Sequence, residues 1–418
     1  MKIMYNTDMG KEKNEREERI FNKNYILLSA VNTLLFISFN MINPVLPGYV
    51  TGMGMSVTLA GIISGCFSIT ALVFRPLSGL AADRVNPKKL YLAAGLGITL
   101  TCALYPVCGG FGPLFAVRVL HGVFFAVDTT VALAMVVRFI PEGKTGEAIG
   151  LFGIGPIIAI SFAPGMGLKI SDWYGAELSF LIAAAMSLLA TICIAAISYE
   201  KEKGPEKDQE IDIVKEDSLR KKEERERGIK RFIATDVALF AFLAGLFSFS
   251  NSIEYTFMEL YSRTKGIDDI SIYFTVSAVF ILISRLFAGK IYDRKGLTVI
   301  LFPAFAAGMI SMFILGKATC LAVFLAAGAL KALGQGAGQP SLQSHCMTSV
   351  GKDRIGIASS TYYLGPDIMQ GLGPIAGGLI IDCAGYESAY YLCSGLLAFG
   401  MAIYGVYLLL KKRKTAKG

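Results

Sequence analysis

The chain is short of charge for its size. Only 17% of its 418 residues are charged, whereas 54% are hydrophobic and the mean hydropathy is +0.55. A soluble protein of this length needs more charged residues than this to cover its surface. The composition therefore excludes an ordinary soluble globular protein.

Residues typical of metal sites and catalytic centres are also scarce. There are two histidines, and the eight cysteines lie in or beside apolar stretches, without a CxxC motif or a nearby histidine. We therefore expect no disulfide, no metal and no cofactor, and interpret the cysteines as small hydrophobic packing residues. Neither a nucleotide-binding loop nor a catalytic triad is found, so we expect that the protein is not an enzyme.

Long hydrophobic runs are abundant. About 20 apolar residues in a helix suffice to cross a bilayer. Twelve such stretches are found, at 24–50, 57–80, 89–109, 112–139, 146–168, 177–199, 232–258, 269–292, 297–316, 319–346, 356–380 and 388–410. The sequence thus predicts an all-α membrane protein with twelve transmembrane helices.

Basic residues are distributed unequally between the connecting segments. Of the 40 Lys and Arg, 32 fall in the termini, in the even-numbered loops or at the span ends that adjoin these loops, 4 in odd-numbered loops and 4 in the interior of spans. The positive-inside rule then predicts a multi-pass protein of the cell membrane with both termini in the cytoplasm. The net charge of +8 follows from this bias and requires no nucleic-acid partner.

The same pattern suggests a division of the chain. Residues 1–23 are charged and lead into a full-length span, so we expect a cytoplasmic tail and no cleavable signal peptide. Residues 200–231 hold 11 basic and 11 acidic residues and are predicted to be a cytoplasmic linker. It separates six-helix halves at 24–199 and 232–410, and 411–418 forms a basic cytoplasmic tail.

One phrase occurs twice. RPLSGLAADRVNPKK begins at Arg75 and RLFAGKIYDRKG begins at Arg285, 210 residues later. At the same offset, Gly, Pro and Asp residues of the fifth span recur in the eleventh, in the pairs Gly155/Gly365, Pro156/Pro366, Pro164/Pro374, Gly167/Gly377, Asp172/Asp382 and Gly175/Gly385. We infer a duplicated six-helix unit, arranged as two pseudo-symmetric halves.

Polar residues recur on every third span, in spans 1, 4, 7 and 10. Helical spacing places them on one face of each helix, so we expect these helices to line a central cavity and spans 3, 6, 9 and 12 to face lipid. Ionisable residues inside spans are costly and indicate function. The candidate substrate- or proton-binding residues are Asn32, Asn40, Arg118, His121, Asp128, Glu254, Lys331, Gln335 and Asp367. Lys331 and Asp367, both near the middle of their spans, are interpreted as a buried ion pair or a proton-linked switch.

The repeated phrase resembles the signature loop of the major facilitator superfamily, and the resemblance covers nearly the whole chain. The residues that carry it are Arg75, Gly79, Asp83 and Arg84 in the first copy and Arg285, Gly289, Asp293 and Arg294 in the second. The resemblance implies that each carboxylate faces a helix N-terminus of the other half and acts as a gating latch. Asn86 replaces the usual glycine of the family, and we expect it to tolerate a left-handed backbone.

Two further motifs resemble those of the same family. Arg118-x-x-His121-Gly122 is similar to a motif whose arginine is linked to proton transfer in proton-coupled members. The family's efflux motif is complete in span 11, at Gly373, Pro374, Gly377 and Gly378, but span 5 keeps only Pro164 and Gly167. As simple helix-packing residues, these glycines and prolines would require no transport role.

Three functions remain open at this stage. The first is a secondary transporter working by alternating access, as a proton-coupled exporter of drugs or metabolites. The second is a proton-linked or facilitative uptake permease for a sugar or organic acid, and the third is a non-transporting membrane sensor on the same fold. For a carrier we expect a small-molecule substrate, protons and the lipid bilayer as partners, and a functional monomer.

Overall fold

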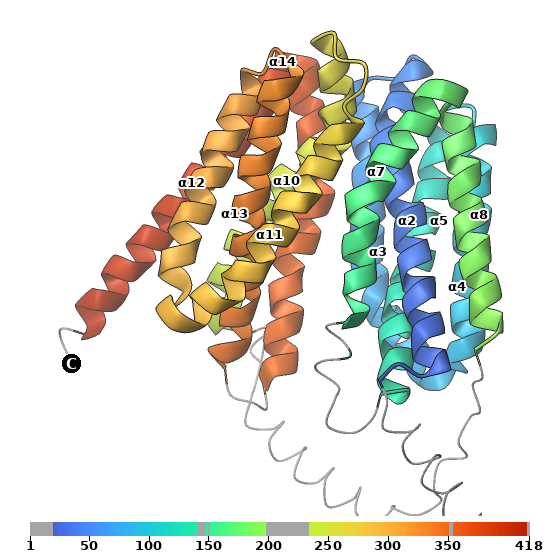
Figure 1. The fold of residues 1–418 in the computed structure, drawn as a ribbon, viewed down its shortest axis with the longest axis horizontal. Coiled ribbons are helices and arrows are strands. Elements are labelled where there is room, and N and C mark those ends of the chain that lie inside the picture. The colour runs from blue at the N-terminus through green and yellow to red at the C-terminus, as the bar shows by residue number, and fades with distance from the viewer. Residues whose placement is uncertain (1–19, 141–147, 149–150, 198–233, 351–353, 416–418) are drawn as a thin grey trace, which may run out of the picture. The chain divides into compact units, whose positions relative to one another are not determined.

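The structure, a computed structural model, describes residues 20–140, 148, 151–197, 234–350 and 354–415 (Figure 1). Across these residues all regular secondary structure is helical. This agrees with the predicted all-α class, because in lipid a helix pairs its backbone groups within one segment. Most of the predicted linker at 200–231 and of the N-terminal tail lies outside the described residues.

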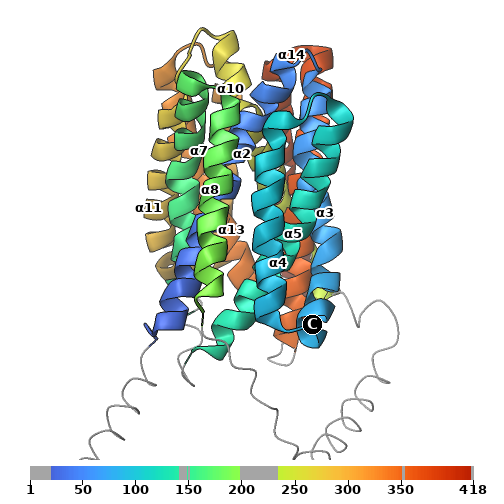
Figure 2. The same ribbon diagram turned by 90° about the vertical axis from the view of Figure 1, so that its right-hand side faces the viewer.

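The first half of the chain forms six long helices. They are α2 (Lys23–Gly52), α3 (Val57–Arg84), α4 (Pro87–Leu104), α5 (Phe111–Arg138), α7 (Ile154–Tyr174) and α8 (Ala176–Ala195). A short 3₁₀ helix, η1 (Tyr105–Val107), extends α4. Figure 2 shows α4 beside both α5 and α8, and α2 packs against α7 and α8.

The second half begins with a 3₁₀ turn, η3 (Thr235–Val237), and continues in long helices. They are α10 (Ala238–Thr264), α11 (Ser271–Lys295), α12 (Leu297–Gly316), α13 (Leu321–Thr348) and α14 (Ile355–Thr415). The last of these contains two helices joined at Gly385, whose φ of 83° and ψ of 168° are not helical. With α14 divided there, each half contributes six long helices within the described residues.

Ten of the described helices are long and apolar enough to cross a membrane, α14 being counted once. The more polar α10 is not among them. With 27 residues it is nevertheless about 40 Å long, which exceeds the thickness of a bilayer core. The twelve helical segments therefore fit the twelve predicted spans.

The chain divides into two compact units. One contains Met1–Tyr199 together with Tyr255–Ala278, and the other contains Glu200–Glu254 and Val279–Gly418. The first unit thus includes the end of α10 and the start of α11, in addition to the six helices of the first half. The predicted half at 232–410 included that segment, which these units assign to the first half instead.

Polar side chains and glycines fix the helix ends. The side chains of Asn22 and Ser56 accept hydrogen bonds from backbone N–H groups at the starts of α2 and α3, at 2.9 and 3.3 Å. Before α11, Asp269 accepts from the backbone N–H and the hydroxyl of Ser271, which lowers the pKa of Asp269. Other helices stop at glycines with positive φ, such as Gly175 at 93° and Gly296 at 75°.

Two predicted spans are displaced from the observed helices. The stretches predicted at 146–168 and 232–258 correspond to α7 and α10, which end six residues further along the chain, at Tyr174 and Thr264. Lys169 and Arg263, which the sequence analysis placed in loops, lie in these last turns. Hydropathy marks where apolar residues stop, whereas a helix continues through polar residues until a positive-φ glycine ends it.

The sequence analysis expected spans 3, 6, 9 and 12 to face lipid, and this stays a prediction. Spans 3, 6, 9 and 12 expose large apolar side chains, among them Leu100, Ile192, Phe313 and Leu409. Helices α3, α7 and α11 also expose such side chains, so exposure is not limited to every third helix.

Packing against glycine follows the duplication. A Cβ atom on Gly155 of α7 would overlap the side chain of Thr33 on α2, and a Cβ on Gly365 of α14 would overlap the carbonyl oxygen of Ala241 on α10. The fifth span thus contacts the first, and the eleventh contacts the seventh, through equivalent glycines. Gly167 and Gly373 approach Met41 and Ser252 in the same way. Pro164, Pro374, Gly377 and Gly378 are buried in these two helices.

Replacing Gly365 by alanine should destabilise the fold, because the new methyl group meets backbone rather than a movable side chain. Overpacking of this kind costs about 1–3 kcal/mol. Gly395, in the second of the two helices of α14, is the control, since a Cβ there meets no described atom within 4 Å. We expect a lower thermal unfolding midpoint in detergent for Gly365→Ala but not for Gly395→Ala. Equal midpoints for the two variants would contradict the proposed contact.

Candidate functional site

A buried arginine is the centre of a polar cluster in the first unit. Arg118 of α5 is 2% exposed, and its guanidinium donates to the side-chain oxygen of Asn43 at 2.5 Å and to the hydroxyl of Tyr105 at 3.4 Å. The ring centre of Phe67 lies 4.5 Å from the guanidinium carbon, a cation–π distance. Neutral dipoles and an aromatic ring therefore surround this charge, and among the described residues no carboxylate forms an ion pair with it.

His121 belongs to the same cluster. It lies one turn beyond Arg118, is fully buried, and its Nδ1 lies 3.1 Å from the hydroxyl of Tyr105. Its Nε2 has no hydrogen-bond partner within the part of the chain that the structure describes. The hydroxyl of Tyr105 thus lies within reach of both Arg118 and His121, and a role of the two in proton or substrate binding stays a prediction.

Asp128 is also buried, and it lies further along α5 than Arg118 and His121, away from their cluster. It is 1% exposed, and its Oδ1 has no hydrogen-bond partner in the described ranges. A carboxylate buried without a cation is costly, and a buried carboxyl group avoids that cost by binding a proton. Asp128 is therefore well suited to gain and lose a proton when its surroundings change.

The second unit contains a buried ion pair. The ammonium of Lys331 on α13 lies 3.1 and 3.0 Å from the two carboxylate oxygens of Glu254 on α10, and 2.6 Å from the side-chain oxygen of Asn251. The two charged side chains are 7% and 3% exposed. The sequence analysis interpreted Lys331 and Asp367 as a buried ion pair or a proton-linked switch, and it did not foresee the pair of Lys331 with Glu254. Lys331 faces α10, where spacing of three residues presents Asn251 and Glu254 together.

Amide side chains extend this polar face along α13. Gln335 donates to Gln339 at 3.1 Å, and Gln339 donates to the hydroxyl of Ser248 on α10 at 2.8 Å. Gln335 Oε1 has no partner among the residues described. Spans 7 and 10 therefore meet through their polar faces, and the central cavity expected along these faces stays a prediction.

The other candidate residues lie apart from the two clusters. Asn32 donates to the backbone oxygen of Phe152 at 3.3 Å. Asn40 donates to the backbone oxygen of Phe36 at 2.7 Å and accepts from the hydroxyl of Tyr255 at 2.8 Å. Asp367 is half-buried on α14.

The repeated phrase is helical rather than a loop. Arg75, Gly79, Asp83 and Arg84 lie in the second half of α3, and Arg285, Gly289, Asp293 and Arg294 lie in the second half of α11. A Cβ on Gly79 or Gly289 would meet no described atom within 4 Å. The latch role of Asp83 and Asp293 remains a prediction.

The two copies of the phrase end differently. Asn86 has an extended backbone, with φ −60° and ψ 116°, and its side chain accepts from the N–H groups of Lys88 and Lys89. The left-handed geometry expected for Asn86 is therefore wrong. Gly296 at the equivalent position has φ 75° and no capping side chain. A side chain that can cap the next helix thus replaces the backbone freedom of glycine.

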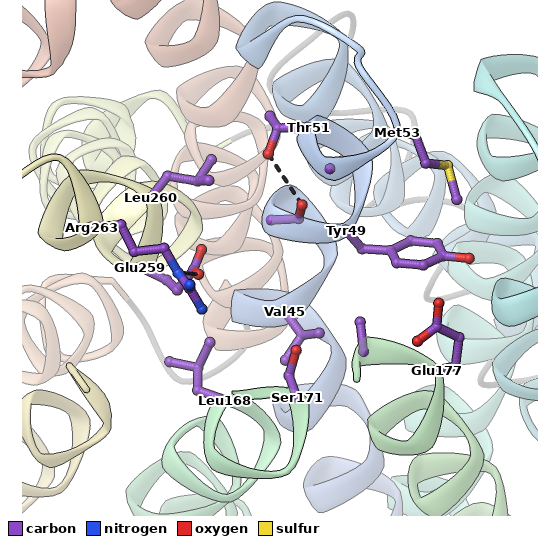
Figure 3. Close-up of a pocket in the computed structure, with 13 residues that line it drawn as sticks. Val45, Tyr49, Thr51, Met53, Leu168, Ser171, Glu177, Glu259, Leu260 and Arg263 are labelled. Carbon is purple, nitrogen blue, oxygen red and sulfur yellow. Dashed lines mark hydrogen bonds and ion pairs between the residues drawn. The ribbon is translucent and has the colours of Figure 1, made fainter. Parts of the chain in front are cut away.

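A cavity of about 640 Å³ opens in the first unit, at the end of α2 that is remote from Lys23 (Figure 3). Its walls combine apolar and polar side chains from α2, α7, α8 and α10, including Val45, Tyr49, Leu168, Glu177, Glu259 and Arg263. Arg263 donates to Asp172 at 2.5 Å and also to Glu259. Glu259 is 8% exposed, and its Oε2 has no partner within the described residues.

Sequence reasoning missed Glu259, Arg263 and the role of Asp172. It placed Arg263 in a loop and ended the seventh span before Glu259. One signal for Asp172 was present, since its match to Asp382 at the repeat offset was noted, but no partner could be assigned without the three-dimensional packing. Tyr105 had no signal, because it lies at the end of a span that showed little polarity.

The contribution of the Lys331–Glu254 ion pair to stability can be tested by substitution. Lys331→Met should lower the thermal unfolding midpoint in detergent, because removing one partner of a buried pair costs about 3–5 kcal/mol. The double variant Lys331→Met/Glu254→Gln should recover most of this loss, since no buried charge is left without its cation. Lys317→Met, at an exposed lysine, is the control. A single variant as stable as the wild type would show that the pair is not formed.

Known proteins resemble the chain along most of its length. The model of the Major Facilitator Superfamily matches residues 28–369. The multi-drug resistance efflux pump PmrA of Streptococcus pneumoniae is 25% identical over 392 residues, covering 88% of this chain and 92% of the pump. The staphylopine export protein of Staphylococcus aureus is 22% identical over 380 residues, covering 87% of this chain and 91% of the exporter.

The fold is shared with solved transporter structures. A variant of the nucleoside transporter NupG matches with a TM-score of 0.73 and 12% sequence identity, covering 92% of this chain and 99% of that one. Identity this low supports the fold alone. The match of the family model, over more than half of the chain, shows that this protein belongs to the major facilitator superfamily.

Proposed function

We propose that the protein is a secondary transporter that exports drugs or small metabolites across the cell membrane by alternating access, driven by protons. In such a carrier, a proton and a substrate bind to one set of helices, and their binding free energies bias two conformations. The proposal includes a functional monomer with both termini in the cytoplasm.

The burial of Asp128 is the observation that carries the proton-coupled mechanism. A proton-driven carrier needs a carboxyl group that is protonated in one state and ionised in another. Asp128 fits this role, because it is 1% exposed and its Oδ1 has no partner among the described residues. Glu254 fits less simply, because the ammonium of Lys331 compensates its charge.

Export is favoured by the named relatives and by the chemistry of the cavity in Figure 3. The cavity presents Tyr49 and Leu168 beside Glu177, a combination that suits molecules with an apolar body and a polar or cationic group. At the end of α2 opposite the N-terminus, it would lie on the outer side of the membrane in the proposed orientation. There it would contact substrate that is leaving the protein.

A comparison of deletion and overexpression strains tests the direction of transport. We expect overexpression to raise drug tolerance and to lower the cellular content of the transported compound, with opposite changes on deletion. A strain that overproduces Asp128→Asn provides the control for effects of protein load alone. Higher cellular content on overexpression would instead indicate uptake.

Uptake is the second candidate, and a specific observation favours it. The efflux motif is incomplete in α7, which reads Ala163-Pro164-Gly165-Met166-Gly167-Leu168, whereas α14 holds the complete copy. A sensor without transport activity would change neither tolerance nor cellular content in the strain comparison.

Proton coupling can be located by neutralising one carboxyl group at a time. Asp128→Asn should abolish transport driven by a pH gradient in proteoliposomes, while substrate exchange at fixed pH continues. The reason is that a proton carrier must change its charge during the cycle, whereas exchange of substrate need not involve this step. Glu254→Gln and Asp367→Asn are compared in the same assay, because both are alternative proton carriers.

The exchange rate serves as the internal control for folding and substrate binding. Loss of both activities in Asp128→Asn would indicate a structural role for this residue. Undiminished gradient-driven flux in all three variants would refute proton coupling through these carboxyl groups.

A further inference from the structure

A groove lies between the start of α12 and the last turns of α14, away from both buried polar clusters. Its volume is about 1000 Å³, and it is lined by Thr298, Phe302, Gly405, Leu408, Leu409, Lys411 and Lys412. Gly405 leaves space in the wall, since a Cβ atom there would have only Phe302 nearby, at 3.9 Å. The groove is therefore apolar along its length and basic at one end.

In the first half of the chain, the equivalent space between the start of α4 and the end of α8 is closed. There the ammonium of Lys88, at the start of α4, donates to the carbonyl oxygens of Ala195 and Ile197 at the end of α8, at 2.9 and 2.7 Å. Thr298 occupies the position of Lys88 at the repeat offset of 210, and its short side chain lies 2.9 Å from the hydroxyl of Tyr404. The two halves have thus diverged at this junction, and the second half has an open groove there.

The first N–H groups of α12 also differ from those of α4. Asn86 caps α4 through its side chain, whereas α12 begins after Gly296, which has no side chain to accept a hydrogen bond. Unpaired N–H groups at a helix start favour a negative group. Together with Lys411 and Lys412, both exposed, they give one end of the groove a preference for an anion.

The surroundings of the groove point to lipid rather than to a water-soluble anion. Leu409 is 64% exposed, and Val406 and Leu410 are each 55% exposed on the same helix. In a membrane protein such a surface contacts acyl chains, and basic pockets beside transmembrane helices bind anionic lipid headgroups. A phospholipid satisfies both ends of the groove, because its phosphate suits the lysines and its acyl chain suits Phe302 and Leu409.

We propose that this groove is a binding site for one anionic phospholipid, with its headgroup at Lys411 and Lys412 and an acyl chain along Phe302, Gly405 and Leu409. This site does not depend on which substrate the protein carries or on the direction of transport. It links the composition of the bilayer to the helix pair α12–α14.

Native mass spectrometry of the purified full-length protein with phosphatidylglycerol or phosphatidylcholine tests the site. We expect one phosphatidylglycerol to bind more tightly than phosphatidylcholine. The variant Lys411→Gln/Lys412→Gln should bind it about 30-fold more weakly, which corresponds to about 2 kcal/mol for two lysines. The control Lys89→Gln/Lys317→Gln removes the same charge from other helix ends and should bind as the wild type does.

A second variant tests the apolar wall without changing charge. Gly405→Leu should also weaken phosphatidylglycerol binding, because its side chain enters the space that the acyl chain occupies. Unchanged unfolding midpoints confirm that each variant is folded.

Three outcomes would overturn the proposal. The first is wild-type affinity in the Lys411→Gln/Lys412→Gln variant, and the second is equal binding of the two lipids. The third is a different occupant of the groove. Complete displacement of the lipid by inorganic phosphate would indicate a site for soluble anions, and zero-length cross-links from Lys411 or Lys412 to residues 200–231 would identify an acidic segment of this chain.

Discussion

A charged group inside an apolar environment needs a partner within the protein. This requirement shapes the structure. Lys331 and Glu254 meet it as an ion pair, and Arg118 meets it through Asn43, Tyr105 and an aromatic face. Each solution fixes two helices relative to each other, since the partners come from different helices in each unit. The polar faces of spans 1 and 4, and of spans 7 and 10, are therefore contact surfaces as well as candidate binding surfaces.

Periodicity and composition were sufficient to predict the fold class and the number of spans. They did not reach properties that depend on which neighbour a side chain meets. Lys331 and Asp367 were related by their depth along the helices alone, and Glu254 of α10, at hydrogen-bonding distance from Lys331, was not recognised as its partner. Helix ends were also misplaced at α7 and α10, because hydropathy does not register the glycine that stops a helix. The carboxylate of Glu259 was missed for the same reason, since it lies beyond the predicted end of its span.

Because the chain contains two similar halves, equivalent positions of the two halves can be compared within one sequence. Glycines that contact another helix are kept, as at Gly155 and Gly365, where any side chain would overlap a neighbour. Residues at the ends of α4 and α12 are not kept, as Lys88 and Thr298 illustrate. Positions in close helix packing therefore keep the same residue in both halves, whereas residues at helix ends differ and make different contacts in each half.

Gly175 and Gly385 each join two spans without an intervening loop, at φ values of 93° and 83°. Residues with a side chain adopt this backbone geometry only with strain, so replacing either glycine would disturb a turn between two membrane helices. Each half of the chain therefore contains a tight hairpin that depends on one glycine, and two such positions limit which substitutions the protein tolerates.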